Sequence, residues 1–454
     1  RQIARHTVER NYIALFALVG FLTLTYLFAA MYMRRFLAPI YEKLRDVAAV
    51  SFAIGIVMLL CLLVRIVIGF DLGVLQFSNA AMPVASAAML LALLYGARPA
   101  ITLAFFAAVT IAVVTAPRIS LLVMYLFGCM TGAISTTDAR RRSDLFKSGL
   151  LVAVVQITVV VLIGMLRGEP VASIRVDMLS AVVSGLLSAV IVQALLLPLE
   201  AISHRISNFT LLELGDLNHP LLQALLRKAP GTFQHSQHVA LLSQSAAEAI
   251  GANALMARVG AYFHDIGKMR KPEYFTENQS PGENPHDKLK PSLSAAVIKA
   301  HVLDGIIMAQ EEKLPESVID FISQHHGTAV ISVFYHRALE TVGEEIEVNR
   351  GDYQYPGPKP QIQETGILML ADRVEATSRS MMKPTANRIE RMVKKTIAEV
   401  FESGELDECE LTLKDLTIIA DRFTHVLCGI YHTRRAEYPE AGKIAEAEKK
   451  AKEK

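Results

Sequence analysis

The stretch "AYFHDIGKMRKP" (261–272) decides how the second half of this chain is interpreted. It places His264 directly before Asp265 at the end of an apolar run, with Lys268 one helical turn further on. Burying adjacent His and Asp side chains costs free energy unless a partner compensates them. The stretch therefore predicts that other groups in the fold, or a bound ligand, hold this pair.

Other His and Asp residues fall on predicted helices at positions that should face the interior. His235, for example, lies on the same helical stripe as the apolar residues Val239 and Leu242. The inward set, spread over five helices, is His235, His264, Asp265, His301, His325, His326 and Asp372. One inward His is usually a hydrogen-bonded core residue, but five unpaired polar insertions would each cost a few kcal/mol. A shared metal cluster explains them, because neutral imidazoles and carboxylates suit divalent iron, manganese or zinc.

The chain of 454 residues is unevenly apolar and has room for two or three domains. Hydrophobic residues make up 52% of it, and the long Leu, Val, Ala and Ile runs lie in the first half. The net charge of +2 does not indicate a nucleic acid, and we expect neither DNA nor RNA as a partner. The four cysteines lack CxxC or zinc spacing, which gives no sign of a disulfide framework or a cysteine metal site.

Seven apolar runs precede residue 200, and a bilayer span needs about 20 largely apolar residues. The predicted spans are 12–33, 50–70, 81–97, 100–116, 119–136, 148–166 and 176–199. Lys and Arg residues concentrate in the first and fifth loops, so the positive-inside rule places the odd-numbered loops and everything after residue 200 in the cytoplasm. Arg65 is the one clear charge within a predicted span, which disfavours a transporter. Residue 1 is Arg rather than Met, so we expect 1–11 to be an extracytoplasmic stub of a longer protein.

The second half has the composition of a globular domain, preceded by a linker helix over 201–228. Helices are predicted at 232–250, 253–267, 291–311, 315–326, 329–341, 362–381, 386–402 and 411–432. Almost nothing alternates with a period of two, so the domain is predicted to be all-α. The stretch 342–361, which contains "YPGPKP", is expected to be an irregular loop, and the charged tail 436–454 is expected to be frayed or disordered.

The order H…HD…D, formed by His235, His264, Asp265 and Asp372, resembles the pattern of HD-domain metal-dependent phosphohydrolases. The surrounding segments are "GTFQHS", "VGAYFHDIGK", "NPHDKL", "FISQHHGT", "FYHRALE" and "YPGPKP". They are similar to those of the seven-transmembrane-receptor HD family, whose PgpH-type members are cyclic-di-AMP phosphodiesterases. An HD pair alone is a weak signal, whereas the whole set in this order is specific.

The resemblance covers about 229–435 together with the seven preceding spans. It implies an all-α protein in which a seven-helix transmembrane bundle (12–200) is followed by a cytoplasmic, all-helical HD domain (229–435). It also implies the membrane of a bacterial cell as the location. Family members usually carry an extracellular domain ahead of the spans, and the sequence shown has none, so the signal that would act there stays unidentified.

The resemblance further implies the metal ligands and the reaction. It assigns His235, His264, Asp265 and Asp372 to one ion, and His301, His325 and His326 to a second ion, with Asp265 bridging both. Two divalent ions, manganese or iron, are expected as cofactors. The implied reaction is hydrolysis of cyclic di-AMP to the linear dinucleotide pApA by a hydroxide that bridges the ions. Regulation through the membrane part is also expected.

Other residues are expected to act on the substrate. The expected catalytic set is Asp265, His264 and Lys268. The expected substrate-binding set is Lys268, which should reach a phosphate oxygen, with His286, Arg337 and Lys359 in the nucleotide groove. Each has an ordinary surface role as the alternative. His238 is interpreted as structural, because the family motif places the ligand at His235.

Three alternative functions stay open from the sequence. A cyclic-di-GMP phosphodiesterase of the HD-GYP kind would carry a GYP signature after the paired histidines, where this chain has "GTAVISVFYH". A nucleotide triphosphohydrolase is a further possibility within the HD superfamily. A signalling receptor whose HD domain only binds nucleotide is disfavoured by the complete ligand set. The expected partners are cyclic di-AMP and the lipid bilayer; a homodimer and an extracellular signal are left open.

Overall fold

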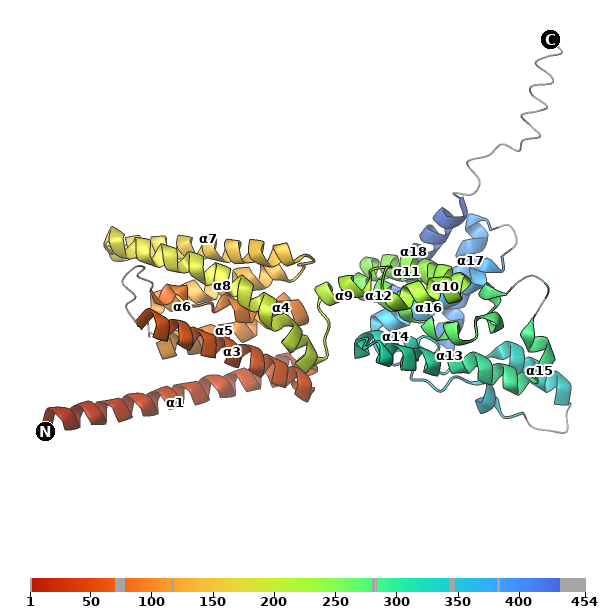
Figure 1. The fold of residues 1–454 in the computed structure, drawn as a ribbon, viewed down its shortest axis with the longest axis horizontal. Helices are drawn as coiled ribbons and strands as arrows, with labels where there is room; N and C mark the ends of the chain where they lie inside the picture. Colours follow the sequence, from red (N-terminus) through yellow and green to blue (C-terminus); the bar gives the residue numbers. More distant parts are fainter. Residues whose placement is uncertain are drawn as a thin grey trace, which may run out of the picture. The chain divides into compact units, whose positions relative to one another are not determined.

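A computed structural model describes residues 2–69, 78–115, 118–279, 282, 284–342, 348–381 and 384–432. The chain divides into two compact units, Arg1–Thr210 and Leu211–Lys454, which are described separately (Figure 1). Within the described residues there is no β-strand, only an isolated bridge between Val330 and Gln354. The prediction of an all-α protein is confirmed. The predicted tail 436–454, residues 343–347 of the predicted irregular loop and the last residues of the spans 50–70 and 100–116 lie outside the described residues.

The first unit is a bundle of apolar helices. Its elements are α1 (Gln2–Phe36), α2 (Ala38–Tyr41), α3 (Leu44–Gly69), η1 (Asn79–Ala81), α4 (Ala85–Tyr95), α5 (Ala97–Thr115), α6 (Ile119–Thr136), α7 (Arg142–Arg167) and α8 (Val171–Ser203). Among them, α1, α3 and α5 to α8 are long and apolar enough to cross a membrane. Figure 1 shows α7 and α8 lying side by side along their length. With the shorter α4, they form the seven apolar helices that the sequence predicts.

The third predicted span, 81–97, is only partly helical. Its helix α4 has 11 residues, which corresponds to about 16 Å, whereas the hydrocarbon core is about 30 Å thick. Non-helical backbone is tolerated at membrane depth only where protein surrounds it. This condition is met, because Ser184 donates to the carbonyl of Met82 (2.7 Å) and Tyr125 donates to the carbonyl of Asn79 (2.7 Å).

The segment from Ser78 to Tyr95 nevertheless connects opposite ends of the bundle. The amide of Ser78 donates to Ser180, 23 residues before the end of α8 (2.9 Å). Tyr95 instead donates to Asp46 (3.0 Å), at the beginning of α3. Arg205, just after α8, reaches the same carboxylate with two hydrogen bonds of 2.8 and 2.9 Å. The end of α8 and the end of α4 therefore meet at Asp46, and the short helix still completes a crossing.

The secondary structure of the second unit, over its described residues, is helical apart from the Val330–Gln354 bridge, and its core is formed by α11, α12, α16 and α18. Its elements are α10 (Pro220–Lys228), α11 (Pro230–Ile250), α12 (Ala254–Phe263), η2 (Ile266–Arg270), η3 (Pro272–Tyr274), η4 (Thr276–Asn278), η5 (Pro285–Lys288), α13 (Pro291–Glu311), α14 (Glu316–Gln324), α15 (Ser332–Val342), η6 (Arg350–Tyr353), α16 (Gln363–Arg379), α17 (Ala386–Glu402) and α18 (Leu413–His432). Helix α9 (Asn208–Leu214) contains the division between the units, inside the predicted linker 201–228.

Two predicted helices end earlier than expected. The helix predicted over 253–267 stops at Phe263, and the one predicted over 315–326 stops at Gln324. In both cases a pair of polar residues, His264-Asp265 or His325-His326, follows the last helical residue and leaves the helix axis. Helix α13 is also long and apolar enough to cross a membrane, but it packs against α14, α15 and η2 inside this unit.

Candidate metal centre

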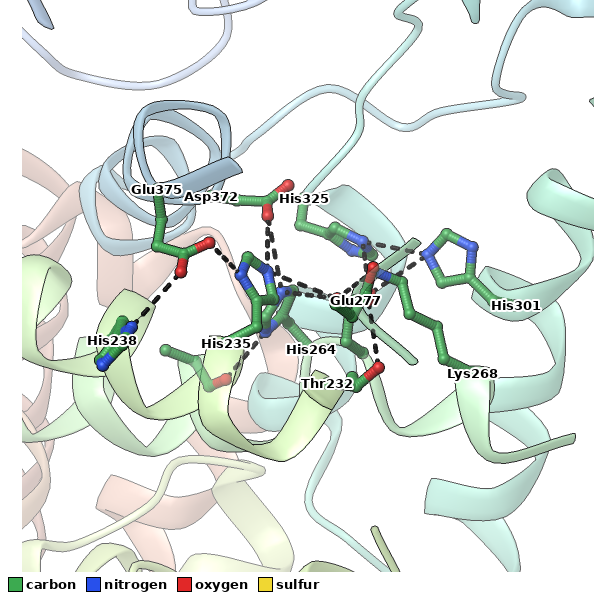
Figure 2. A network of polar contacts seen from close by, with 12 residues as sticks. Thr232, His235, His238, His264, Lys268, Glu277, His301, His325, Asp372 and Glu375 are labelled. Carbon is green, nitrogen blue, oxygen red and sulfur yellow. Dashed lines mark hydrogen bonds and ion pairs between the residues drawn. The ribbon is translucent and has the colours of Figure 1, made fainter. Parts of the chain in front are cut away.

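The second unit brings all seven predicted ligand residues together, as Figure 2 shows for most of them. They come from α11 (His235), the end of α12 (His264, Asp265), α13 (His301), the end of α14 (His325, His326) and α16 (Asp372). All are buried except the half-buried His326. Seven polar side chains therefore converge in the interior of one helical domain.

Glycine residues allow the helices that carry these side chains to approach closely. A Cβ atom at Gly267 in η2 would overlap the carbonyl oxygen of His301 in α13. A Cβ atom at Gly260 in α12 would overlap the ring of Phe321 in α14. These two contacts place the residues that follow α12 directly beside α13 and α14, which brings Asp265 within reach of the histidines on both.

Asp265 lies at the middle of the cluster. Its Oδ2 is 3.2 Å from Nε2 of His264 and 3.6 Å from Nε2 of His235. Its Oδ1 is 3.4 Å from Nε2 of His301 and 3.6 Å from Nε2 of His325. One carboxylate oxygen thus faces each group of histidines, which is the geometry that a bridging ligand requires.

Asp372 also lies between the two groups. Its Oδ1 is 2.9 Å from Nε2 of His235, and its Oδ2 is 3.9 Å from Nδ1 of His326. Burial raises the pKa of Asp372, but the neighbouring imidazoles of His235, His264 and His326 lower it well below the usual range. The side chain is therefore ionised and available as a ligand on α16.

Three of the histidines have a fixed ring orientation because Nδ1 donates a hydrogen bond to a backbone carbonyl. The pairs are His264 with Ala261 (2.8 Å), His301 with Ile298 (2.6 Å) and His325 with Ile322 (2.8 Å). A carbonyl can only accept, so Nδ1 of each ring carries a proton, and Nε2 is the nitrogen that faces Asp265. Histidines that bind metals donate their other ring N–H in the same way.

The residues present fit two divalent ions. Donor atoms lie within 4.8 Å of one another in two groups, His235 with His264 and Asp265, and His301 with His325 and His326. Nε2 of His264 and Oδ1 of Asp265 are buried and have no hydrogen-bond partner among the described residues. Buried polar atoms without a partner cost free energy unless a ligand satisfies them. Imidazole nitrogens with carboxylate oxygens are a donor set for manganese, iron or zinc.

Lys268 lies inside this centre rather than at the surface. Its ammonium is 2.6 Å from Oδ2 of Asp265 and 2.9 Å from Oε1 of Glu277. Burial lowers the pKa of Lys268, but the two carboxylates more than reverse this and raise it above its ordinary value. Burial raises the pKa of Asp265, while His264 and Lys268 lower it well below the usual range. Lys268 therefore remains a cation at the centre, and its contact with a phosphate oxygen stays a prediction.

Two further carboxylates were not identified from the sequence. Glu277, on η4, accepts from Lys268 and from Thr232 (3.1 Å). Glu375 accepts from Nδ1 of His235 (2.5 Å). Burial lowers the pKa of His235, but hydrogen bonds to Asp372 and Glu375 raise it to about 9. Glu375 follows Asp372 by three residues on α16, so helical periodicity could have indicated it; no comparable signal exists for Glu277.

The remaining predicted substrate residues lie apart from the cluster. Nε2 of His286 donates to the carbonyl of Tyr274 (2.9 Å), and Lys359 donates to the carbonyl of Gly404 (2.8 Å). Arg337 is 3.9 Å from Asp287. Within the described ranges, none of these three residues contacts the seven-residue cluster by a hydrogen bond or ion pair, and their roles in a nucleotide groove stay predictions.

His238 points away from the cluster. Its side chain is 44% exposed, and Nδ1 lies 3.4 Å from Oε1 of Glu375. Among the described residues, His238 therefore contacts the carboxylate of Glu375 and neither of the two groups of metal-donor atoms. This agrees with its interpretation as a structural residue.

Comparison with known proteins covers both units. Residues 12–207 match the family described as 7TM receptor with intracellular HD hydrolase, and residues 232–377 match the HD domain. The cyclic-di-AMP phosphodiesterase PgpH of Bacillus subtilis (strain 168) is 42% identical over 323 residues, which are 71% of this chain and 45% of that protein. The protein of the same name from Listeria monocytogenes serotype 1/2a (strain 10403S) is 38% identical over 363 residues, covering 79% and 50% of the two chains.

The second unit also resembles a solved domain. The crystal structure of the L. monocytogenes phosphodiesterase PgpH HD domain in complex with cyclic-di-AMP is 44% identical, with a TM-score of 0.46, and covers 47% of this chain and 99% of that chain. The chain spans about half the length of the curated relatives it matches.

Proposed function

Because the chain belongs to the family of seven-transmembrane receptors with an intracellular HD hydrolase domain, we propose that it is a membrane-bound, metal-dependent phosphodiesterase that converts cyclic di-AMP to linear pApA. The observation that carries this proposal is the position of Asp265 between two groups of histidines. The names of the PgpH relatives supply the substrate.

The proposed chemistry divides between the ions and the chain. Two divalent ions supply, when bound, a hydroxide nucleophile at neutral pH and charge stabilisation on phosphoryl oxygens. The carboxylate of Asp265 would hold the two groups of ligands at a fixed separation. Lys268, held by Asp265 and Glu277, provides a buried positive charge beside them, suited to the added negative charge of the transition state.

The first prediction concerns the substrate. The full chain, purified in detergent and loaded with manganese or ferrous iron, is expected to convert cyclic di-AMP to pApA, and cyclic di-GMP at least about tenfold more slowly, a difference of about 1.4 kcal/mol in barrier. Product chromatography of both reactions, with and without a chelator, measures this. Faster turnover of cyclic di-GMP would reassign the substrate, and turnover that survives complete metal removal would contradict the proposal.

The second prediction concerns the side of the membrane. The chain is a multi-pass membrane protein, and we propose that the HD domain lies in the cytoplasm of a bacterial cell. Alkaline phosphatase, which is active only outside the cytoplasm, is expected to be inactive when fused after Arg141 or Lys454. Fused after Glu169, in the loop between α7 and α8, it is expected to be active. The reverse pattern would overturn the orientation.

We also propose that the membrane unit regulates hydrolysis. The segment that leaves α8 is held to the bundle by Arg205 and by Glu200, which accepts from the amide of Ser207 and the hydroxyl of Thr210 (both 2.8 Å). A rearrangement of α3 or α4 around Asp46 would therefore displace the start of α9. Because the backbone of α9 continues into the second unit, these contacts would pass a rearrangement of the bundle along the chain toward that unit.

A further inference from the structure

Glu375 contacts the candidate metal centre through Nδ1 of His235, the ring nitrogen that faces away from the other donor atoms. It lies on α16 one turn after Asp372, so both carboxylates project from the same face of the helix, and its side chain is 3% exposed. The ring of His235 stands between them: Nε2 is 2.9 Å from Asp372, and Nδ1 is 2.5 Å from Oε2 of Glu375 (Figure 2). The nitrogen that faces the donor groups is thus opposite the one that Glu375 holds.

The contact with Glu375 gives Nδ1–H of His235 a hydrogen-bond acceptor, a role that backbone carbonyls have for the neighbouring histidines. His264, His301 and His325 each donate Nδ1–H to the carbonyl three residues earlier. His235 donates to a side chain that comes from a different helix, 140 residues away in sequence. Its orientation therefore depends on how α16 packs against α11, and on a group that a single substitution can remove.

The carboxylate of Glu375 is itself held in place. Nε of Arg379 lies 3.0 Å from both of its oxygens, and Nη2 lies 2.9 Å from Oε2. Nδ1 of His238 lies 3.4 Å from Oε1. The series Arg379, Glu375, His235 is a continuous line of hydrogen bonds that ends at the donor group of the first ion.

We infer that Glu375 is a positioning residue of the metal centre, which keeps Nε2 of His235 aimed at the ion; this inference rests on the proposed function. Outer carboxylates of this kind typically change metal affinity by about 10- to 100-fold. The same contacts also fit a different role, namely balancing the charge of Arg379 within α16. The positioning role requires the length of the Glu375 side chain, whereas the charge-balance role requires its negative charge. Two substitutions therefore separate the two roles.

Glu375→Gln keeps the reach and loses the charge. Its amide oxygen, in place of Oε2, can still accept from Nδ1 of His235 and from Nη2 of Arg379. The amide nitrogen, in place of Oε1, faces His238, which can accept from it, and loses the contact with Nε of Arg379. Glu375→Asp keeps the charge and the pairing with Arg379 but withdraws the oxygens from His235 by one methylene. If Glu375 positions His235, metal affinity should decrease from the wild type to Glu375→Gln and further to Glu375→Asp. If Glu375 balances the charge of Arg379, the metal affinity of Glu375→Asp should be closer to the wild type than that of Glu375→Gln.

The experiment is a manganese titration of the full chain in detergent, with free manganese followed by electron paramagnetic resonance. Glu375→Asp is expected to weaken the affinity for one of the two ions by about 10- to 100-fold, and Glu375→Gln is expected to weaken it less. Glu402→Asp, which makes the same substitution at an exposed glutamate at the end of α17, serves as the matched control and is expected to bind both ions as the wild type does. Thermal midpoints without metal report on folding.

Two results overturn the inference. Wild-type affinity for both ions in Glu375→Asp would show that the contact does not position His235. A loss in Glu375→Gln that exceeds the loss in Glu375→Asp would show that charge is what matters. In either case a wild-type chain that binds two ions and hydrolyses cyclic di-AMP leaves the proposed function standing, whereas a wild-type chain that binds neither manganese nor ferrous iron overturns both.

Discussion

Replacing Asp265 by Ala is expected to abolish hydrolysis of cyclic di-AMP and to lower the metal content of the chain. The two carboxylate oxygens face different histidine groups at 3.2 to 3.6 Å, so one substitution removes a ligand from both ions. We expect turnover to fall by at least about 10³-fold, because the electrostatic stabilisation of the phosphoryl group depends on both ions. Product chromatography and elemental analysis of the same preparation measure the two effects.

The alternative explanation of the contacts around Asp265 is a buried salt bridge with Lys268, which lies 2.6 Å away. Removing one partner of a buried pair costs about 3–5 kcal/mol. Here Lys268 keeps Glu277 at 2.9 Å, so the fold is expected to survive, with only a moderate decrease in thermal midpoint. Asp421→Ala, an exposed Asp on α18, is the control for removal of a carboxylate. Activity near the wild-type level in Asp265→Ala would contradict a bridging role.

The sequence indicated most of the second unit because several of its helices are amphipathic or begin at a proline. The helices predicted over 232–250, 291–311 and 386–402 occur as Pro230–Ile250, Pro291–Glu311 and Ala386–Glu402. Proline at the first turn of the first two is pre-organised for a helix and lacks an N–H that would have no partner within the helix. Inward stripes on these helices were sufficient to identify His235 and His301.

The end of α12 and the start of α4 could not be predicted from the sequence, because both depend on contacts between distant segments. Helix α12 stops at Phe263 because the residues after it pack against α13 through Gly267, a contact that has no local signal. The short helix α4 ends at Gly96, whose φ of 81° favours glycine, but its late start depends on Ser184 and Tyr125 from other helices. Apolar composition alone cannot distinguish such a buried, interrupted crossing from a continuous span.

Replacing His301 by Asn is expected to remove one ion and leave the other. The amide nitrogen of Asn can take the place of Nδ1 and still donate to the carbonyl of Ile298, so the buried hydrogen bond survives while the Nε2 ligand is lost. The second group then retains only His325 and His326 beside Asp265, whereas His235, His264 and Asp372 are untouched.

Elemental analysis of His301→Asn is therefore expected to fall from about two ions per chain to about one, with turnover of cyclic di-AMP lowered by at least about 100-fold, because a two-ion site uses both ions to stabilise the attacking and leaving oxygens. His336→Asn, an exposed histidine on α15, is the matched control and should change neither value. Retention of both ions would show that His301 is not a ligand. A chain that holds one ion and hydrolyses at the wild-type rate would instead require a mechanism in which the second histidine group plays no part in the chemistry.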